Sequence, residues 1–447
     1  MTTSVRRRES AGRGPLHEIG LNTLAFGLII AVQQLVIFPG LAGRSGPVAF
    51  SDLILLITVS TIAVNVIGTE ASKVSLIRAP AYRSHDLPWD VPRIVMISAG
   101  GAGLLVLAVW LLGWLPANAA LPCGLIVLLG IARTYATTPD RHEGAYGRVI
   151  LVHGAYAAGA VAGFLLIGPG DMLLLPFLVA ESVSAVVAGI VRLRHRTVRW
   201  TMRRTPLYPG TLRAFLGLAA IAVLINGVTY IDRLAITPLL GAGALAVYYS
   251  ATALSSSLSL ITNPAGNAVL ARLGRVPDER RAQLLARGLV LVPPLILVFW
   301  GASAVIAYAG LALLYPSHLP AALPLLLPVS LTAAFSNAVT LLAPLLQRFG
   351  PIRQLLGTYL VYAAAYLIAV LLLSRSHGLL GFAWAGTTAQ AVLLVITITR
   401  IAIGSRRRPS AASPPREPGE PSDVPPDPRG ASPQGTESRT LQRGALP

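Results

Sequence analysis

The stretch GLNTLAFGLIIAVQQLVIFP, from Gly20 to Pro39, contains no charged residue over its whole length. A helix of this length rises about 30 Å, which matches the thickness of the hydrocarbon core of a bilayer. The run is too long for the apolar core of a cleavable signal peptide, and no clear small-residue cleavage site follows it. It therefore predicts a transmembrane helix that is retained in the protein.

Similar apolar runs recur along the rest of the chain. Hydrophobic residues make up 54% of its 447 residues and charged residues only 12%, against about 25% charged residues in a typical soluble domain. So few charges could not cover the surface of a soluble protein of this length. We expect an all-α polytopic membrane protein with about twelve transmembrane helices, at about 20–38, 48–68, 93–115, 118–138, 149–168, 172–191, 213–234, 243–266, 288–312, 321–345, 354–373 and 379–400.

The basic residues set the expected orientation. The formal net charge is +18, and of the 36 lysines and arginines all except Arg44, Arg233 and Arg375 fall on the alternate loops that share one side with the two termini. Under the positive-inside rule that side faces the cytoplasm. We therefore expect both termini in the cytoplasm and the protein in the bacterial plasma (cytoplasmic) membrane. Topology accounts for the charge and leaves no support for binding to nucleic acid.

A basic segment, 192–212, divides the expected helices six and six. It either determines the topology alone or also lies against anionic lipid head groups. The last residues are rich in Pro, Ser, Gly and Arg, and they cannot bury enough apolar area to fold. We expect a cytoplasmic N-terminus at 1–19, one six-helix lobe at 20–191, a second at 213–404 and a disordered cytoplasmic tail at 405–447.

No pattern in the sequence indicates an enzyme. Cys123 is the single cysteine, the seven histidines are scattered, and the glycine-rich runs lack the following Lys-Ser/Thr of a phosphate-binding loop. The expected outer loops are too short to hold a catalytic domain. We expect no catalytic residue, no metal site, no cofactor and no ATP-binding motif.

The two halves share a weak internal repeat. The segments GLAGRSGPVAFSD (40–52) and LLGAGALAVYYSA (239–251) follow the first and the seventh expected helix. At an offset of 199 residues, identical or similar residues align in the pairs Leu41/Leu240, Val48/Val247, Phe50/Tyr249 and Ser51/Ser250. Since each half has six helices, both halves would have the same orientation, as parallel repeats about an axis along the membrane normal.

The stretch YIDRLAITPLLGAGALAVYYSATALSSSLSLITNPAGNAVLARLG, from Tyr230 to Gly274, resembles the start of the second lobe of polysaccharide flippases. In that family a helix that ends in an aspartate is followed by a Leu-Gly turn and a tyrosine-containing helix. The corresponding elements here are Asp232, Leu240-Gly241 and Tyr248-Tyr249. The segment 22–67 resembles the matching pair of the first lobe. The family is the oligosaccharide-lipid flippase branch of the MOP superfamily, whose relatives include the multidrug (MATE) exporters and the lipid II flippases.

This resemblance implies two lobes around a central cleft and movement of a lipid-linked glycan across the membrane. It also implies membrane lipid as a partner, coupling to a proton or sodium gradient, and contact with other membrane proteins of glycan assembly. Many members have fourteen helices, whereas twelve are expected here. The lipid II branch lines its cavity with several arginines, and the sequence does not place a matching set.

Glu181 is the most informative polar residue within an expected span. An ionised carboxylate near the middle of a helix costs about 2.5–3.5 kcal/mol on insertion scales. Two interpretations follow. The side chain faces a wet cavity and binds substrate hydroxyls, a proton or a cation, or it is protonated and joins two helices by a hydrogen bond.

Polar stripes indicate which helix faces meet at the cleft. Asn226, Tyr230 and Arg233 share one face of the seventh span, and Asp232 points elsewhere. The second and eighth spans carry stripes that advance by seven residues, namely Ser51, Thr58 and Asn65 in one and Tyr249, Ser256 and Asn263 in the other. Packing of small polar residues between helices is the competing explanation.

Gln33 and Gln34 are adjacent in the first span, so we expect them on different faces and at most one of them in the cavity. The candidate cavity residues are Glu181, Asn226, Tyr230, Arg233, Asn263, Gln33 and Asn65, and the candidates for ion coupling are Glu181 and Asp232.

The leading hypothesis is a transporter that flips a polyprenyl-linked oligosaccharide, or another precursor of a cell-surface polysaccharide, by alternating access. The alternatives are a MATE-like, cation-coupled exporter of drugs or small solutes, a polyprenyl-dependent membrane enzyme, and a non-catalytic component of a glycan-assembly complex. The short outer loops disfavour the enzyme.

Overall fold

The computed structural model describes residues 15–111, 117–142, 145–168, 172–194, 203–263, 265–266, 281–349 and 352–406. All of them belong to one compact unit, 1–406. Residues 1–14 of the expected N-terminus, 195–202 of the basic segment and 407–447 of the tail expected to be disordered lie outside the described residues, whereas residues 405 and 406 belong to α18.

The first half of the chain forms long apolar helices joined by short turns. Two of them continue through a π-helical segment, which is defined by i→i+5 hydrogen bonds and is rare in proteins. In chain order the elements are α2 (Pro15–Val32), the π-helix η1 (Gln33–Ile37), α3 (Phe38–Arg44), α4 (Pro47–Val64), the π-helix η2 (Asn65–Thr69), α5 (Glu70–Ser84), α6 (Val91–Leu111), α7 (Ala117–Ala136), α8 (Thr138–His142), α9 (Tyr146–Leu165) and α10 (Leu175–Arg194).

The second half begins with two helices joined by a single residue. Gly241 has a φ of 89°, a left-handed value that favours glycine, and it allows α12 to begin directly after α11. The elements of this half are α11 (Tyr208–Leu240), α12 (Ala242–Ser255), the 3₁₀ helix η3 (Ser256–Leu258), α14 (Arg281–Val290), α15 (Val292–Leu314), α16 (Leu319–Ala322), the 3₁₀ helix η5 (Leu323–Leu325), α17 (Leu326–Phe349) and α18 (Ile352–Arg406).

Ten helices in the described part of the chain are long and apolar enough to cross a membrane. α18 covers two of the spans expected from the sequence. The two parts of α18 meet at Gly378, where the backbone is non-helical. α6 corresponds to another expected span, 93–115, although its apolar segment, Val91–Leu107, is shorter than those of the ten helices. A polytopic helical membrane protein is therefore confirmed, and the count of twelve spans stays a prediction.

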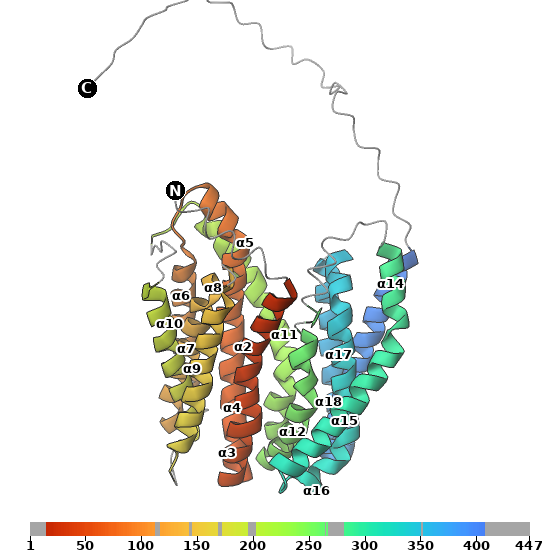
Figure 1. Ribbon diagram of the computed structural model, residues 1–447. Helices are drawn as coiled ribbons and strands as arrows, with labels where there is room; N and C mark the ends of the chain where they lie inside the picture. Colours follow the sequence, from red (N-terminus) through yellow and green to blue (C-terminus); the bar gives the residue numbers. More distant parts are fainter. Residues whose placement is uncertain are drawn as a thin grey trace, which may run out of the picture. The chain divides into compact units, whose positions relative to one another are not determined.

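Helix packing follows the order of the chain within each half. α9 packs against α2 and α10, and α17 packs against α15 and α18. Contacts between the halves run mainly through α4 with α12 and α11, and through α5 with α11. In Figure 1 the labels α2 to α10 lie on one side of the bundle and α12 to α18 on the other.

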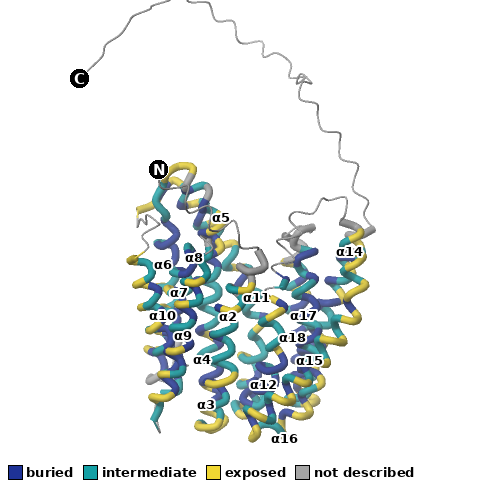
Figure 2. The backbone as a smooth tube through the Cα atoms, viewed as in Figure 1, coloured by how far each residue is buried: buried dark blue, intermediate teal, exposed yellow. Residues whose placement is uncertain are grey.

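Large apolar side chains remain exposed along the outer faces of the helices. Leu104, Val290 and Leu313 expose 68%, 76% and 80% of their surface. Figure 2 shows such exposed positions on the same helices as deeply buried ones. A soluble protein rarely exposes so much contiguous apolar surface, whereas lipid chains would cover it.

Two glycines bring α9 unusually close to α10. A Cβ atom on Gly159 would lie 3.0 Å from Ala180 Cα, and one on Gly163 would lie 2.7 Å from Pro176 Cα. Small residues four positions apart allow helix backbones to approach in this way in membranes. This contact fixes the position of α10, which carries Glu181.

We predict that Gly163→Leu destabilises the protein by more than about 2 kcal/mol, because an overpacked helix contact must open. Thermal unfolding in detergent measures the effect. Gly147→Leu is the control on the same helix, since a Cβ atom there meets nothing within 4 Å. Equal melting temperatures for the two variants would contradict the packing described here.

Candidate functional site

A cavity of about 570 Å³ lies among α2, α4, α7, α9, α10, α11 and α12 and their π-helical continuations. Many polar side chains line it although it lies within the membrane-spanning helices. The polar lining residues are Gln33, Gln34, Thr58, Ser60, Thr61, Asn65, Thr69, Arg133, Thr134, Arg141, Tyr156, Glu181, Tyr230, Arg233, Tyr249 and Ser256.

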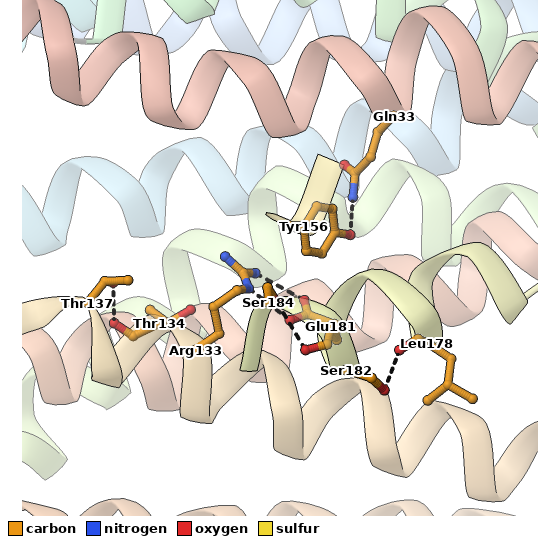
Figure 3. A network of polar contacts seen from close by, with 9 residues as sticks. All are labelled: Gln33, Arg133, Thr134, Thr137, Tyr156, Leu178, Glu181, Ser182 and Ser184. Carbon is orange, nitrogen blue, oxygen red and sulfur yellow. Dashed lines mark hydrogen bonds and ion pairs between the residues drawn. The ribbon is translucent and has the colours of Figure 1, made fainter. Parts of the chain in front are cut away.

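An ion pair forms one wall of the cavity. Arg133 of α7 donates from Nε to Glu181 Oε2 at 2.8 Å and from Nη2 to Oε1 at 3.0 Å. The two side chains are 11% and 6% exposed, and Figure 3 shows both hydrogen bonds from one edge of the guanidinium. Two-point pairing of this kind is geometrically specific as well as charge-assisted. Glu181 therefore has a charged partner, which neither interpretation of the sequence included.

Close packing of α7 makes this pair possible. A Cβ atom on Gly130 would lie 3.2 Å from Glu181 Oε1 and 2.8 Å from Val64 Cγ2. The absence of a side chain at Gly130 leaves room for the carboxylate between α7 and α10.

A tyrosine holds the other side of the same guanidinium. Arg133 Cζ lies 4.9 Å from the centre of the Tyr156 ring, within the range of a cation–π contact. Gln33 Nε2 donates to the Tyr156 hydroxyl at 2.7 Å, as Figure 3 shows. Four side chains from α2–η1, α7, α9 and α10 thus form one connected network.

Arg233 faces the cavity from the second half of the chain. Its Cζ lies 5.1 Å from the Tyr230 ring centre and 5.0 Å from that of Tyr249. The sequence places Arg233 on the outer side by the charge count and on the cavity face of the seventh span by its spacing, and in the structure it lines the cavity. α11 continues to Leu240, six residues beyond the expected end at 234, so Arg233 lies further from the end of the helix than the sequence predicts.

Both glutamines of the first span line the cavity, so the expectation that at most one of them does was wrong. Gln33 bonds Tyr156 of α9, and Gln34 Nε2 donates to Tyr249 of α12 at 3.1 Å. The reason is the π-helix that begins at Gln33. A π turn holds more residues than an α turn, so neighbouring side chains diverge less around the axis.

The asparagines have different environments. Asn65 lines the cavity and donates from Nδ2 to Asn226 Oδ1 at 3.1 Å, which ties η2 to α11. Asn226 is its partner and not itself a lining residue. The prediction that Asn263 lines the cavity was wrong, because this residue is exposed at the end of the α12 span and is absent from the lining.

Asp232 points away from the cavity, as its position next to Arg233 predicts. Its Oδ1 accepts the Arg233 backbone N–H at 2.8 Å, and the Tyr248 hydroxyl forms a hydrogen bond with its carboxylate. α11 packs against α18 near this point, where Gln390 Nε2 donates to the Tyr362 hydroxyl at 2.9 Å. Asp232 is thus set in a separate polar cluster within the second half.

Aromatic side chains from the two halves of the chain are in contact near the first residues of α4 and α12. The Tyr249 ring lies 5.3 Å from Phe38 and 6.1 Å from Phe50, and Ser51 Oγ donates to the Ala242 carbonyl. His318 follows in the turn before α16, 6.4 Å from Phe50 and bonded through Nδ1 to Ser250 Oγ at 2.7 Å. Burial lowers the pKa of His318.

Sequence reasoning missed two cavity arginines, Arg133 and Arg141. Both were assigned to the cytoplasmic side by the charge count alone. A signal was present for Arg133, which falls inside the expected span 118–138. A charge inside an apolar run suggests a partner or a cavity, and that argument was applied to Glu181 alone.

No protein-family model and no curated protein sequence matches this chain. Solved structures do match. The lipid II flippase MurJ in an inward closed conformation gives a TM-score of 0.62 at 11% identity over 85% of this chain and 87% of that chain. An outward-facing MATE multidrug transporter of the MOP superfamily gives a TM-score of 0.62 at 13% identity, over 89% of this chain and 98% of that chain.

A MOP superfamily transporter from Pyrococcus furiosus gives a TM-score of 0.58 at 12% identity over 87% and 96%. The reverse polarity of the binding pocket of that transporter suggests a different function for it. At these identities the likeness shows the fold, which is that of the MOP superfamily transporters.

We predict that Arg133→Met destabilises the protein by about 3 kcal/mol or more, because it leaves the Glu181 carboxylate buried without its partner. The double variant Arg133→Met/Glu181→Met should recover most of this loss, since no charge then remains buried. Thermal unfolding of purified protein in detergent measures both. A double variant no more stable than the single one would show that the ion pair is not the cause.

Proposed function

We propose that this protein is a membrane transporter that flips a polyprenyl-linked oligosaccharide, or a related precursor of a cell-surface polysaccharide, across the bacterial plasma membrane. The glycan head group would occupy the cavity while the lipid tail stays in the bilayer. The MOP fold supports a transporter, and the chemistry of the cavity supports this class of substrate.

The charge of the cavity carries the proposal. Three arginines line it, Arg133, Arg141 and Arg233, against one acidic residue, Glu181. A net positive cavity within the membrane attracts an anionic group, and arginine is well suited to phosphate. Polyprenyl carriers attach to their glycan through phosphate groups. The amides and tyrosines beside the arginines would donate to, accept from and stack on sugar rings.

Contacts between residues related by the sequence repeat support two lobes about an axis. Phe50 and Tyr249 are equivalent in the repeat, and their rings lie 6.1 Å apart. Two residues related by a two-fold axis can touch only close to that axis. We infer that the lobes 20–191 and 213–404 close here and separate at the other end, so that the cavity opens alternately. Both termini would lie in the cytoplasm.

A MATE-like exporter of cationic drugs is the second candidate. The solved MATE structures share the fold, and Phe38, Tyr156 and Phe177 supply aromatic faces that suit an organic cation. The excess of arginine opposes it, because a cation would meet like charge in a site of low dielectric constant.

We predict that Arg233→Gln slows flipping of a labelled polyprenyl-diphosphate oligosaccharide in proteoliposomes by at least about tenfold, equivalent to about 1.4 kcal/mol in the activation free energy. Arg375→Gln is the control, because Arg375 is exposed and lies outside the cavity lining. Cells that lack the gene should accumulate the lipid-linked oligosaccharide on the cytoplasmic side. Transport of cationic dyes with no glycan flipping by wild-type protein would favour the MATE-like alternative.

Ion coupling is assigned to Asp232 as part of this proposal, since its carboxylate lies apart from the cavity and beside tyrosine hydroxyls. We predict that a proton or sodium gradient accelerates flipping by the wild-type protein and does not accelerate flipping by Asp232→Asn. Asp52→Asn, at an exposed position of α4, should respond as the wild type does. The same proteoliposomes with an imposed gradient measure all three, and a full response by Asp232→Asn would remove this residue from coupling.

A further inference from the structure

We propose that Glu181 is a positioning residue that fixes the orientation of Arg133 for an anionic head group, and is neither a proton carrier nor a direct ligand of the substrate. This inference rests on the proposed function and assigns to Glu181 a task different from the cavity-ligand and ion-coupling tasks expected from the sequence. The inference is argued from the hydrogen bonds and ring contact of the Arg133 guanidinium.

The first step concerns the hydrogen bonds of Arg133. A guanidinium has five N–H groups in a rigid plane. Glu181 accepts two of them, from Nε and Nη2. The remaining three, including both on Nη1, find no acceptor among the residues that the structure describes. Since Arg133 lines the cavity, these groups are available to a ligand there.

The second step concerns the fit of the pair. Two parallel hydrogen bonds fix the guanidinium plane against the carboxylate, and Tyr156 covers one face of that plane at 4.9 Å. Gln33 in turn holds the Tyr156 hydroxyl. The guanidinium therefore cannot rotate about its long side chain without breaking contacts on two sides. Because the Arg133 side chain is already ordered, binding of a ligand does not cost the conformational entropy of ordering it.

The third step compares the arginines of the two halves. The Arg233 guanidinium lies between two tyrosine rings and forms no ion pair with a carboxylate in the described part of the chain. Arg133 has one tyrosine and one carboxylate. Aromatic faces restrain the guanidinium plane but leave it free to turn within that plane, whereas a two-point carboxylate fixes its direction as well. The first half thus offers an oriented cation and the second half an adaptable one.

Positioning and simple electrostatics predict opposite results for one substitution. Glu181→Gln removes a negative charge about 3 Å from Arg133, which by electrostatics alone strengthens anion binding. It also replaces one acceptor with an N–H donor that faces the guanidinium, which by positioning weakens binding. Glu181→Asp keeps the charge and shortens the side chain by one methylene, so only positioning predicts a loss.

The experiment measures binding of undecaprenyl diphosphate to full-length protein in lipid nanodiscs, with undecaprenol as the uncharged probe. Positioning predicts at least about tenfold weaker binding of the diphosphate by both Glu181→Asp and Glu181→Gln, with undecaprenol unaffected. In an Arg133→Met background, Glu181→Gln should cost no further affinity, because residues that act through one contact are not additive.

Ser182→Ala is the matched control on α10, since the Ser182 hydroxyl only donates to the Leu178 carbonyl. If Glu181→Gln does not fold, binding of the diphosphate by Glu181→Asp and Tyr156→Leu tests the proposal instead. Both variants keep every charge and remove contacts that hold the Arg133 guanidinium in place. Unchanged binding by Glu181→Asp, or tighter binding by Glu181→Gln, overturns the positioning role and leaves the proposed function standing. Wild-type protein that does not distinguish the diphosphate from undecaprenol overturns both.

Discussion

A charge inside a bilayer is stable only beside a partner or in contact with water, and this constraint organises the structure around the pair of Arg133 and Glu181. The pair joins α7 to α10, and it requires both helices to come close. Gly130 on α7 leaves room for the Glu181 carboxylate, and Gly159 and Gly163 on α9 allow α9 to pack closely against α10. The polar cavity is therefore built from close backbone packing as much as from polar residues.

Much of the architecture could be predicted from the sequence, since lipid leaves few options for a backbone whose hydrogen bonds must all be satisfied internally. Apolar length predicted helices at nearly the observed positions. Of the two seven-residue stripes, Thr58, Asn65, Tyr249 and Ser256 line the cavity, whereas Ser51 and Asn263 do not. The predictions failed where a local change of helix geometry or length decided the outcome. Both glutamines of the π-helix that begins at Gln33 line one cavity, and α11 extends six residues beyond its expected end.

Both π-helices begin at an amide that contacts the cavity network, Gln33 in η1 and Asn65 in η2. Extra residues in a turn cost regular hydrogen bonding and often mark functional sites. Apolar periodicity does not reveal them, because a single π turn shifts the phase of a helix without shortening its apolar run. Partners such as Glu181 for Arg133, 48 residues apart in sequence, are also invisible to spacing arguments, since they depend on which helices become neighbours.

The one-residue joint at Gly241 has a mechanical consequence. A longer loop would absorb a tilt of one helix before it reached the next, whereas a joint of one residue would pass a tilt of α12 to α11. Tyr249 stands eight residues beyond the joint and Arg233 eight residues before it, and the two side chains touch. A movement of Tyr249 and its aromatic neighbours would therefore displace Arg233 directly. Separation of the two halves at Tyr249 would then also change the position of the cavity arginine.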